Sequence, residues 1–271
     1  MSVKARTIGL TVAVAGLLLL FASSLTPVPA ADADPALRGL WDFAEGSGDV
    51  LHDTSASKND GKITGGTWIE IPGGHALSLD GKADVVTLPA VPSFYSTFDR
   101  TWTVEMWVKP ETITPGPKML FDKPFTKHDR PYYQIRLAIQ LSDADSNKAY
   151  DLVIVRPSDG GVSLGAYGPA DSAVAGEWAH IVATFDRNTT TLRLYKNGVR
   201  IAECKKPTDP TAAYDNFATG AALGGMLNNP GGYAFNGVIA EARLYNKVLS
   251  AEAVKTRYNE RAEKFGLKIL P

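Results

Sequence analysis

The feature that most constrains the fold is an alternation of apolar and polar residues with a period of two. In residues 132–141, every second residue from Tyr133 to Leu141 is apolar or aromatic, and most residues between them are polar. The same alternation occurs in 103–109, 178–186 and 191–203. In the last run, Asn197-Gly198 is typical of a two-residue hairpin turn. Short alternating strands joined by tight turns predict an all-β fold of two packed antiparallel sheets.

The N-terminal segment does not follow this alternation. Lys4 and Arg6 precede an uncharged apolar run over residues 8–25, and prolines and small residues follow it. This order is typical of a secretory signal, so we expect residues 1–30 to be a signal peptide, cleaved after Ala30 or Ala33. An uncleaved anchor is the alternative, because the run is just long enough to span a membrane. After cleavage we expect no membrane span, and a protein that is secreted, periplasmic or at the cell surface.

The C-terminal segment has helical spacing. Ser250 is a typical N-cap, Glu252 complements the positive helix end, and Val254 and Tyr258 lie four residues apart. We expect one short C-terminal helix that seals an edge of the sheets. Nothing between resembles a linker or a repeat, so the sequence predicts one domain over residues 37–260 and a tail over 261–271.

Charge and cysteine content exclude several kinds of partner. Lys and Arg total 28 against 29 Asp and Glu, a net charge of −1, so we expect no nucleic-acid binding. Cys204 is the only cysteine, which excludes an intrachain disulfide and a metal site built on thiolates. The four histidines have no zinc-binding spacing.

Sequence blocks in a fixed order carry a family resemblance. The block TWTVEMWVKP at 101–110 resembles the family strand F-T-I-E-x-W-V-K-P, and FNGVIAEARLYNKVLS at 235–250 resembles the closing run F-x-G-x-I-D-E-V-R-I-Y-N-R-A-L-S. Further matching blocks lie at 39–43 with 53–61, at 76–86, and at 177–186 with 192–198. The chain resembles the laminin-G-like type of concanavalin A-like lectin/glucanase domain found in secreted bacterial proteins. The resemblance implies a two-sheet antiparallel jelly-roll sandwich with a short C-terminal helix.

This fold hosts sugar-binding modules, glucanases, lyases and adhesion domains, so function depends on the residues. Sugars are bound by aromatic rings that stack on them and by polar groups that contact hydroxyls. Residues of these types occupy the polar strand faces: Glu105, Trp107, Tyr132, Gln134, Arg136, Arg193, Tyr195 and Arg243. If their strands share a sheet, these residues form a polar platform, although an ordinary solvated sheet face has the same composition. The loops at 124–133 and 224–233 are further candidates.

We therefore expect a secreted, non-catalytic module that recognises carbohydrate or glycoconjugate through a sheet face or rim loops. The alternative is a structural or adhesion protein that binds other envelope proteins. A third hypothesis is a divergent glycan hydrolase or lyase, which needs two neighbouring carboxylates. Glu105 and Glu241 have no second acid at i+2 or i+4, and Glu241 with Arg243 is typical of an ion pair. We therefore expect no enzymatic activity.

A structural calcium ion is a further implication of the resemblance. Asp53, Asp80 and Asp84 lie in turns and supply the oxygen ligands that calcium prefers. Two observations stand against it. Aspartates in such turns also bind their own backbone, and Ala240 stands where the family has an acidic residue.

Overall fold

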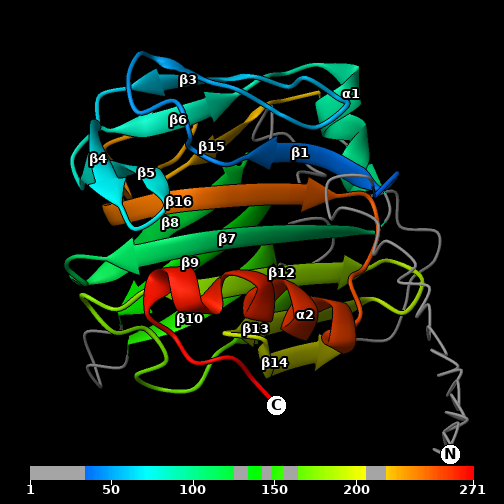
Figure 1. Cartoon of the computed structure of the whole chain (residues 1–271). Coiled ribbons are helices and arrows are strands. Elements are labelled where there is room, and N and C mark those ends of the chain that lie inside the picture. Colours follow the sequence, from blue (N-terminus) through cyan, green and yellow to red (C-terminus); the bar gives the residue numbers. More distant parts are fainter. Residues whose placement is uncertain (1–33, 100, 125–133, 142–147, 156–163, 206–217) are drawn as a thin grey trace, which may run out of the picture.

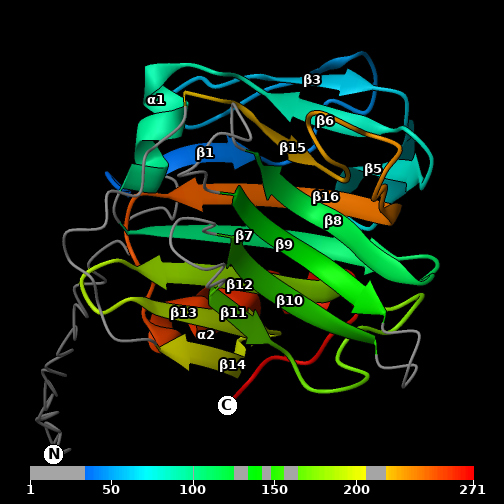
Figure 2. The same ribbon diagram turned by 180° about the vertical axis from the view of Figure 1, so that it is seen from behind.

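A computed structural model of the chain describes residues 34–99, 101–124, 134–141, 148–155, 164–205 and 218–271, with only the backbone of 152–155. The predicted signal peptide and Tyr132 lie outside these residues. The described residues form a sandwich of two antiparallel sheets, which confirms the predicted fold class (Figure 1, Figure 2). None of the helices in the described ranges is long and apolar enough to span a membrane.

Sheet A contains the first and the last strand of the described chain. In spatial order its strands are β14 (Val199–Lys205), β13 (Thr191–Lys196), β12 (Ala179–Asp186), β7 (Trp102–Pro110), β16 (Asn236–Tyr245), β5 (Gly74–Asp80) and β4 (Thr67–Ile71), and β1 (Leu37–Trp41) also pairs with β16. The predicted hairpin joins β13 to β14: Asn197 and Gly198 have φ of 49° and 78°, as a tight two-residue hairpin turn requires.

Sheet B packs against sheet A. In spatial order its strands are β11 (Leu164–Tyr167), β10 (Lys148–Val155), β9 (Gln134–Leu141), β8 (Gly116–Lys123), β15 (Ala221–Leu223), β6 (Val85–Leu88), β3 (Gly61–Thr64) and β2 (Val50–Leu51). The main core lies between the sheets, where side chains such as Met106, Leu137 and Ile181 are fully buried. These are the alternate residues that the period of two assigns to the core face.

Helices close the sandwich at two places. The short α1 (Pro92–Tyr95) and the 3₁₀ helix η2 (Ser96–Asp99) cover one end and bury Phe94 and Phe98; the sequence analysis did not predict them. The predicted C-terminal helix is α2 (Ala251–Arg261), followed by the 3₁₀ helix η3 (Ala262–Phe265). Ser250 caps α2, and its side chain accepts a hydrogen bond from the Ala253 N–H. In Figure 1, α2 crosses the outer face of sheet A over β12 and β13.

Candidate functional site

The outer face of sheet A is closed by the C-terminal helix. Trp107 on β7 stacks on Phe265 with ring centroids 4.3 Å apart and on Tyr258 at 5.9 Å. A second cluster, at the start of the helix, buries Val254 and Leu249 against Tyr195 and Tyr245. Both sides of the central strands of sheet A are therefore buried. The interpretation of 103–109 as a half-buried strand is wrong, because the helix covers its second face.

Buried charges beneath α2 fix the helix to the sheet. The Glu105 carboxylate accepts hydrogen bonds from His180 Nε2 at 3.0 Å and from Arg257 Nε on α2 at 2.7 Å. Glu241 in turn pairs with Arg243 and with Arg261 of α2, each at 2.7 Å. The Glu105 carboxylate is fully buried, and desolvation alone would raise its pKa. His180 and Arg257 outweigh this effect and keep the pKa of Glu105 well below its ordinary value. The predicted Glu241–Arg243 ion pair is thus confirmed.

These contacts correct the predicted platform. Glu105, Trp107, Tyr195 and Arg243 are buried in sheet A beneath α2, and Arg193 at its edge pairs with Glu203 on the neighbouring strand at 2.7 Å. Gln134 and Arg136 lie on β9 of sheet B, and Tyr132 lies outside the described residues. The prediction that these residues share one open face is wrong, because their strands belong to different sheets and a helix occupies one of the two faces.

The outer face of sheet B carries the remaining predicted site residues. Figure 2 shows this face from behind, with β8, β9 and β10 crossing it and no helix over it in the described part of the chain. Strand register places two rows of residues side by side on it. One row runs Ala222, Asp122, Arg136, Val153, Gly165, and the next runs Met119, Ala138, Asp151, Tyr167.

Asp122 organises one end of this face. Its Oδ1 accepts a hydrogen bond from Gln134 Nε2 at 2.7 Å, and its Oδ2 accepts one from the Leu227 N–H at 3.2 Å. Burial raises the pKa of Asp122, although both hydrogen bonds oppose the rise. Because the Gln134 amide donates to Asp122, its carbonyl oxygen stays available as an acceptor.

Arg136 and Asp151 form an incompletely paired couple in the middle of the face. Arg136 NH2 lies 3.4 Å from Asp151 Oδ2, and the Arg136 side chain is 24% exposed whereas that of Asp151 is 1% exposed. Among the described residues, Arg136 Nε and Asp151 Oδ1 are buried without a hydrogen-bond partner. Burial raises the pKa of Asp151 to about 6, even though Arg136 lowers it. Buried polar atoms without partners are uncommon and point to a missing water or ligand.

Tyr167 supplies an exposed aromatic ring beside this couple. Tyr167 on β11 pairs with Asp151 on β10, and 62% of Tyr167 is exposed. A Cβ on Gly165 would lie within 2.6 Å of the Tyr167 ring, so the ring covers this glycine. One side of the ring therefore rests on the strand and the other is open, and a larger residue than glycine would displace it.

Sequence analysis missed Asp122, Asp151 and Tyr167. The signal for the two aspartates was an acid inside an apolar strand, as in Met119-Leu120-Phe121-Asp122, because aspartate is depleted in strands. No local signal marked Tyr167, since a lone tyrosine beside a glycine is equally typical of a turn.

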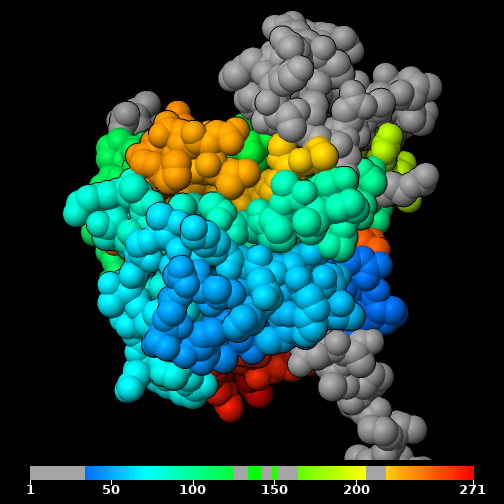
Figure 3. Space-filling model, turned by 90° about the horizontal axis from the view of Figure 1, so that it is seen from above, coloured from blue at the N-terminus to red at the C-terminus, as the bar shows by residue number. Residues whose placement is uncertain are grey.

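The predicted rim loop at 224–233 borders the same face. Besides the bond from Leu227 to Asp122, its Tyr233 carbonyl accepts a hydrogen bond from the Met119 N–H at 2.9 Å. Figure 3 shows this segment, in orange, at the upper edge of the sandwich, where Asn228, Asn229 and Tyr233 are exposed. Most of the other predicted loop, 124–133, lies outside the described residues.

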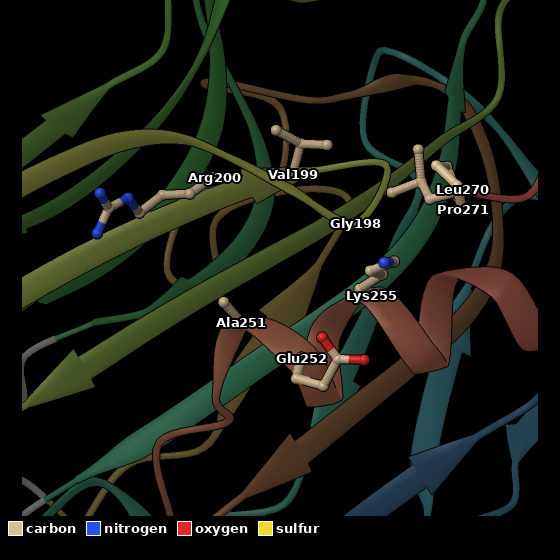
Figure 4. Close-up of a pocket in the computed structure, with 8 residues that line it drawn as sticks. All are labelled: Gly198, Val199, Arg200, Ala251, Glu252, Lys255, Leu270 and Pro271. Atoms are coloured by element: carbon tan, nitrogen blue, oxygen red, sulfur yellow. The ribbon is translucent and has the colours of Figure 1, made fainter.

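A shallow groove of about 400 Å³ lies elsewhere, between the β13–β14 turn, the start of α2 and the chain end (Figure 4). Its lining residues are Gly198, Val199, Arg200, Ala251, Glu252, Lys255, Leu270 and Pro271. Nothing in the described residues indicates what would occupy it.

The aspartates predicted to bind calcium have other roles. The Asp53 carboxylate is buried and accepts hydrogen bonds from the backbone N–H groups of Leu40, Ser55 and Asn59. Asp80 and Asp84 form a turn in which Asp84 accepts from the Asp80 N–H. No group of three or more His, Cys, Asp or Glu in the described ranges is arranged to hold a metal ion.

The position of Ala240 gives a further reason against calcium. It lies in the apolar cluster under α2 with Trp107 and Tyr258, so an acid there would be buried. These contacts do not favour the predicted calcium site, and calcium binding stays a prediction. Melting curves with calcium and with a chelator test it, because an ion bound only to the folded state raises the melting temperature.

Comparison with known families adds one decisive match. Residues 80–255 match the family model of the concanavalin A-like lectin/glucanases superfamily. The chain belongs to this superfamily. The two sheets of the concanavalin A-like domain thus correspond to the sandwich described above, as the sequence resemblance implied.

Solved structures share the fold. Domain 4 of AbnA, a GH43 extracellular arabinanase from Geobacillus stearothermophilus in complex with arabinotriose, matches with a TM-score of 0.57 and 21% identity, over 80% of this chain and 96% of that domain. The binding domain of Paraclostridial Mosquitocidal Protein 1 gives 0.60 and 16%, over 86% of this chain and 55% of that one. The Ruminococcus gnavus IT-sialidase CBM40 bound to alpha2,3 sialyllactose gives 0.50 and 16%, over 72% and 97%. Comparison with curated protein sequences gives no match. At these identities the similarity concerns the fold alone.

Proposed function

We propose that this concanavalin A-like domain is a non-catalytic module that binds carbohydrate on the outer face of sheet B. The observation that carries the proposal is Tyr167, an exposed ring that covers Gly165 beside the Arg136–Asp151 couple. An aromatic ring with one open side stacks on the apolar side of a sugar ring. Arg136 and the Gln134 carbonyl supply a donor and an acceptor for hydroxyl groups.

Relatives of the same fold are consistent with such a role. Two of them are in complex with an oligosaccharide, the arabinanase domain with arabinotriose and the sialidase CBM40 with sialyllactose. Other solved structures of this fold are receptor-binding domains of toxins, one of them in complex with rat synaptotagmin II. A protein partner is therefore the second hypothesis.

The absence of catalysis is part of the proposal. Glu105 and Glu241 lie beneath α2, where no substrate reaches them. On sheet B, Asp122 binds Gln134 and Leu227 with its two oxygens, and Asp151 lies under Arg136. A glycosidase needs one acid and one nucleophile or base on opposite sides of an exposed glycosidic bond. We expect no release of reducing sugar from any polysaccharide that the protein binds.

Calorimetric titration and pull-down with a panel of soluble and insoluble polysaccharides test the proposal. We expect Tyr167→Ala and Arg136→Ala each to weaken binding by about 10-fold or more. The first removes the stacking ring, and the second removes a hydrogen bond from a charged group, which is worth about 1.5–3 kcal/mol. Arg200→Ala, an exposed arginine on β14 of the other sheet, is the matched control and should leave binding unchanged. If no glycan binds the wild type at millimolar concentration, the carbohydrate proposal is wrong, and a search for protein partners follows.

Export is a separate proposal that rests on the sequence. Residues 1–30 have the order of a signal peptide, and none of their structure is described. N-terminal sequencing of the mature protein should begin at Ala31 or Asp34. An intact Met1 in the protein recovered outside the cytoplasm would contradict cleavage.

A further inference from the structure

Near Arg136, the sheet B face carries more acidic than basic side chains among its described residues, and the acidic ones are more deeply buried. In the described ranges, three charged side chains lie close together on this face: Arg136, with Asp122 and Asp151 on the two neighbouring strands. Lys123 follows Asp122, but its ammonium turns inward, 3.0 Å from Thr219 Oγ1 and 5.6 Å from the centre of the Phe98 ring. Lys62 is on the same face but four strands from β9, about 19 Å at the usual strand spacing, beyond the screening length in physiological salt.

We propose, on the basis of the function above, that this face takes a neutral sugar and discriminates against sugars that carry a carboxylate. Among the described residues, one cation flanked by two buried acids gives this part of the face a negative local charge when both acids are ionised. A carboxylate on the ligand would gain from Arg136 but would be repelled by Asp122 and Asp151. The arginine thus serves as a hydrogen-bond donor whose charge is already compensated.

The available hydrogen-bonding groups point the same way. Gln134 is half-buried, and its carbonyl is an acceptor for a donor that a ligand carboxylate lacks. A hydroxyl group both donates and accepts, so adjacent hydroxyls can satisfy this acceptor and the Arg136 guanidinium together. Gln134 and Arg136 are two residues apart on one strand, about 7 Å, which is within the span of a single sugar unit with its substituents.

Titration against matched sugar pairs tests the inference. The probes are lactose with sialyllactose, and a neutral xylo-oligosaccharide with its glucuronic-acid-substituted form. We expect the neutral member of a bound pair to bind at least about 10-fold more tightly in low salt, and the ratio to shrink as salt rises. Asp151→Asn removes one negative charge at nearly constant shape and should reduce the ratio several-fold. Glu203→Gln removes one charge from the exposed edge of sheet A and should leave the ratio unchanged.

Each result decides between the two proposals. Equal or tighter binding of the acidic sugar overturns this inference and leaves carbohydrate binding intact. The same holds if Glu203→Gln changes the ratio as much as Asp151→Asn, because net charge alone would then explain it. If neither member of any pair binds at millimolar concentration, the proposed function itself fails. The affinity ratio of the wild type and its salt dependence are measured without a variant. The inference can therefore be tested even if Asp151→Asn does not fold.

Discussion

Three buried aspartates show how strongly the environment decides what one residue type does. Asp53 accepts three backbone hydrogen bonds, Asp122 binds an amide and a backbone N–H, and Asp151 has one unpartnered oxygen. A buried carboxylate with a full set of donors stabilises its loop, whereas one with few donors is destabilising when ionised. Asp53 therefore stabilises the fold, and Asp122 and Asp151 border the surface on which we propose binding.

Asp53→Ala should lower the free energy of unfolding by at least about 3 kcal/mol, because three backbone N–H groups lose their acceptor in a buried turn. Urea unfolding measures the change. Glu70→Ala, at an exposed position of β4, is the control and should change stability by no more than about 0.5 kcal/mol. A small effect of Asp53→Ala would mean that water replaces the carboxylate.

The raised pKa of Asp151 has a consequence for stability. Its value of about 6 in the folded state exceeds the unfolded value of about 3.9, so the folded state binds the extra proton between these pH values. The extra proton stabilises the folded state. This contribution to the free energy of unfolding is fully present below pH 4 and is lost as the pH rises through 6. Among the described residues, Arg136 on the neighbouring β9 is the charged group in contact with Asp151, and Asp122 lies one strand farther, on β8.

Asp151→Asn removes this dependence. The free energy of unfolding of the variant, relative to the wild type, should rise by about 3 kcal/mol between pH 4 and pH 7, since each pKa unit corresponds to about 1.4 kcal/mol. Denaturant titrations of both proteins across this range provide the measurement. A constant difference between them would show that the Asp151 pKa is not raised.

At the scale of elements, β7 and α2 act as one unit. Glu105 and Trp107 of the strand contact Arg257 and Tyr258 of the helix. Arg261 of the helix pairs with Glu241 on the neighbouring strand β16. A buried ion pair need not be more stable than an apolar contact, but removal of one partner leaves the other charge buried and unpaired. The side chains that sequence analysis assigned to a ligand therefore hold the C-terminal helix.

Glu105→Gln tests this coupling. We expect a loss of about 3–5 kcal/mol at neutral pH, because Arg257 and His180 lose their buried partner. Since the folded pKa of Glu105 lies below its ordinary value, the loss should be complete above about pH 5 and shrink as the pH falls. Glu203→Gln, which removes the two surface ion pairs with Arg193 and Arg200, should cost less than about 1 kcal/mol. Equal melting temperatures for the two variants would contradict the role of Glu105.

At the scale of the whole molecule, the two outer faces of the sandwich differ in whether helices cover them. Sheet A is covered by α2 and η3, which bury Trp107, Tyr245 and Phe265, whereas sheet B has no such helix in the described part of the chain (Figure 1, Figure 2). On sheet B, Tyr167 is exposed and Arg136 is half-buried, whereas Asp122 and Asp151 are buried.

Removal of residues 250–271 should expose the apolar outer face of sheet A. We expect the shortened protein to bind a hydrophobic dye, to melt well below the full chain and to lose hydrogen-exchange protection in β7 and β16, because large exposed apolar patches are rare in stable monomers. Removal of residues 268–271 alone is a milder comparison, since it removes Leu270 from the edge of the Trp107 cluster but keeps α2 and η3. A shortened chain with an unchanged melting temperature would show that the helix is not part of the core.

The sequence by itself determined the strand periodicity, the Asn197-Gly198 turn, the Ser250 cap and hence the fold class, because each depends on residues that are near neighbours in the chain. It also identified Gln134 and Arg136 as facing away from the core. The tertiary structure decided whether such a face meets solvent or a helix, because a period of two separates the sides of a strand but does not show what covers them. Glu105 and Arg136 are equivalent by pattern, but α2, more than 100 residues away in sequence, buries Glu105, whereas Arg136 lies half-buried on the outer face of the other sheet.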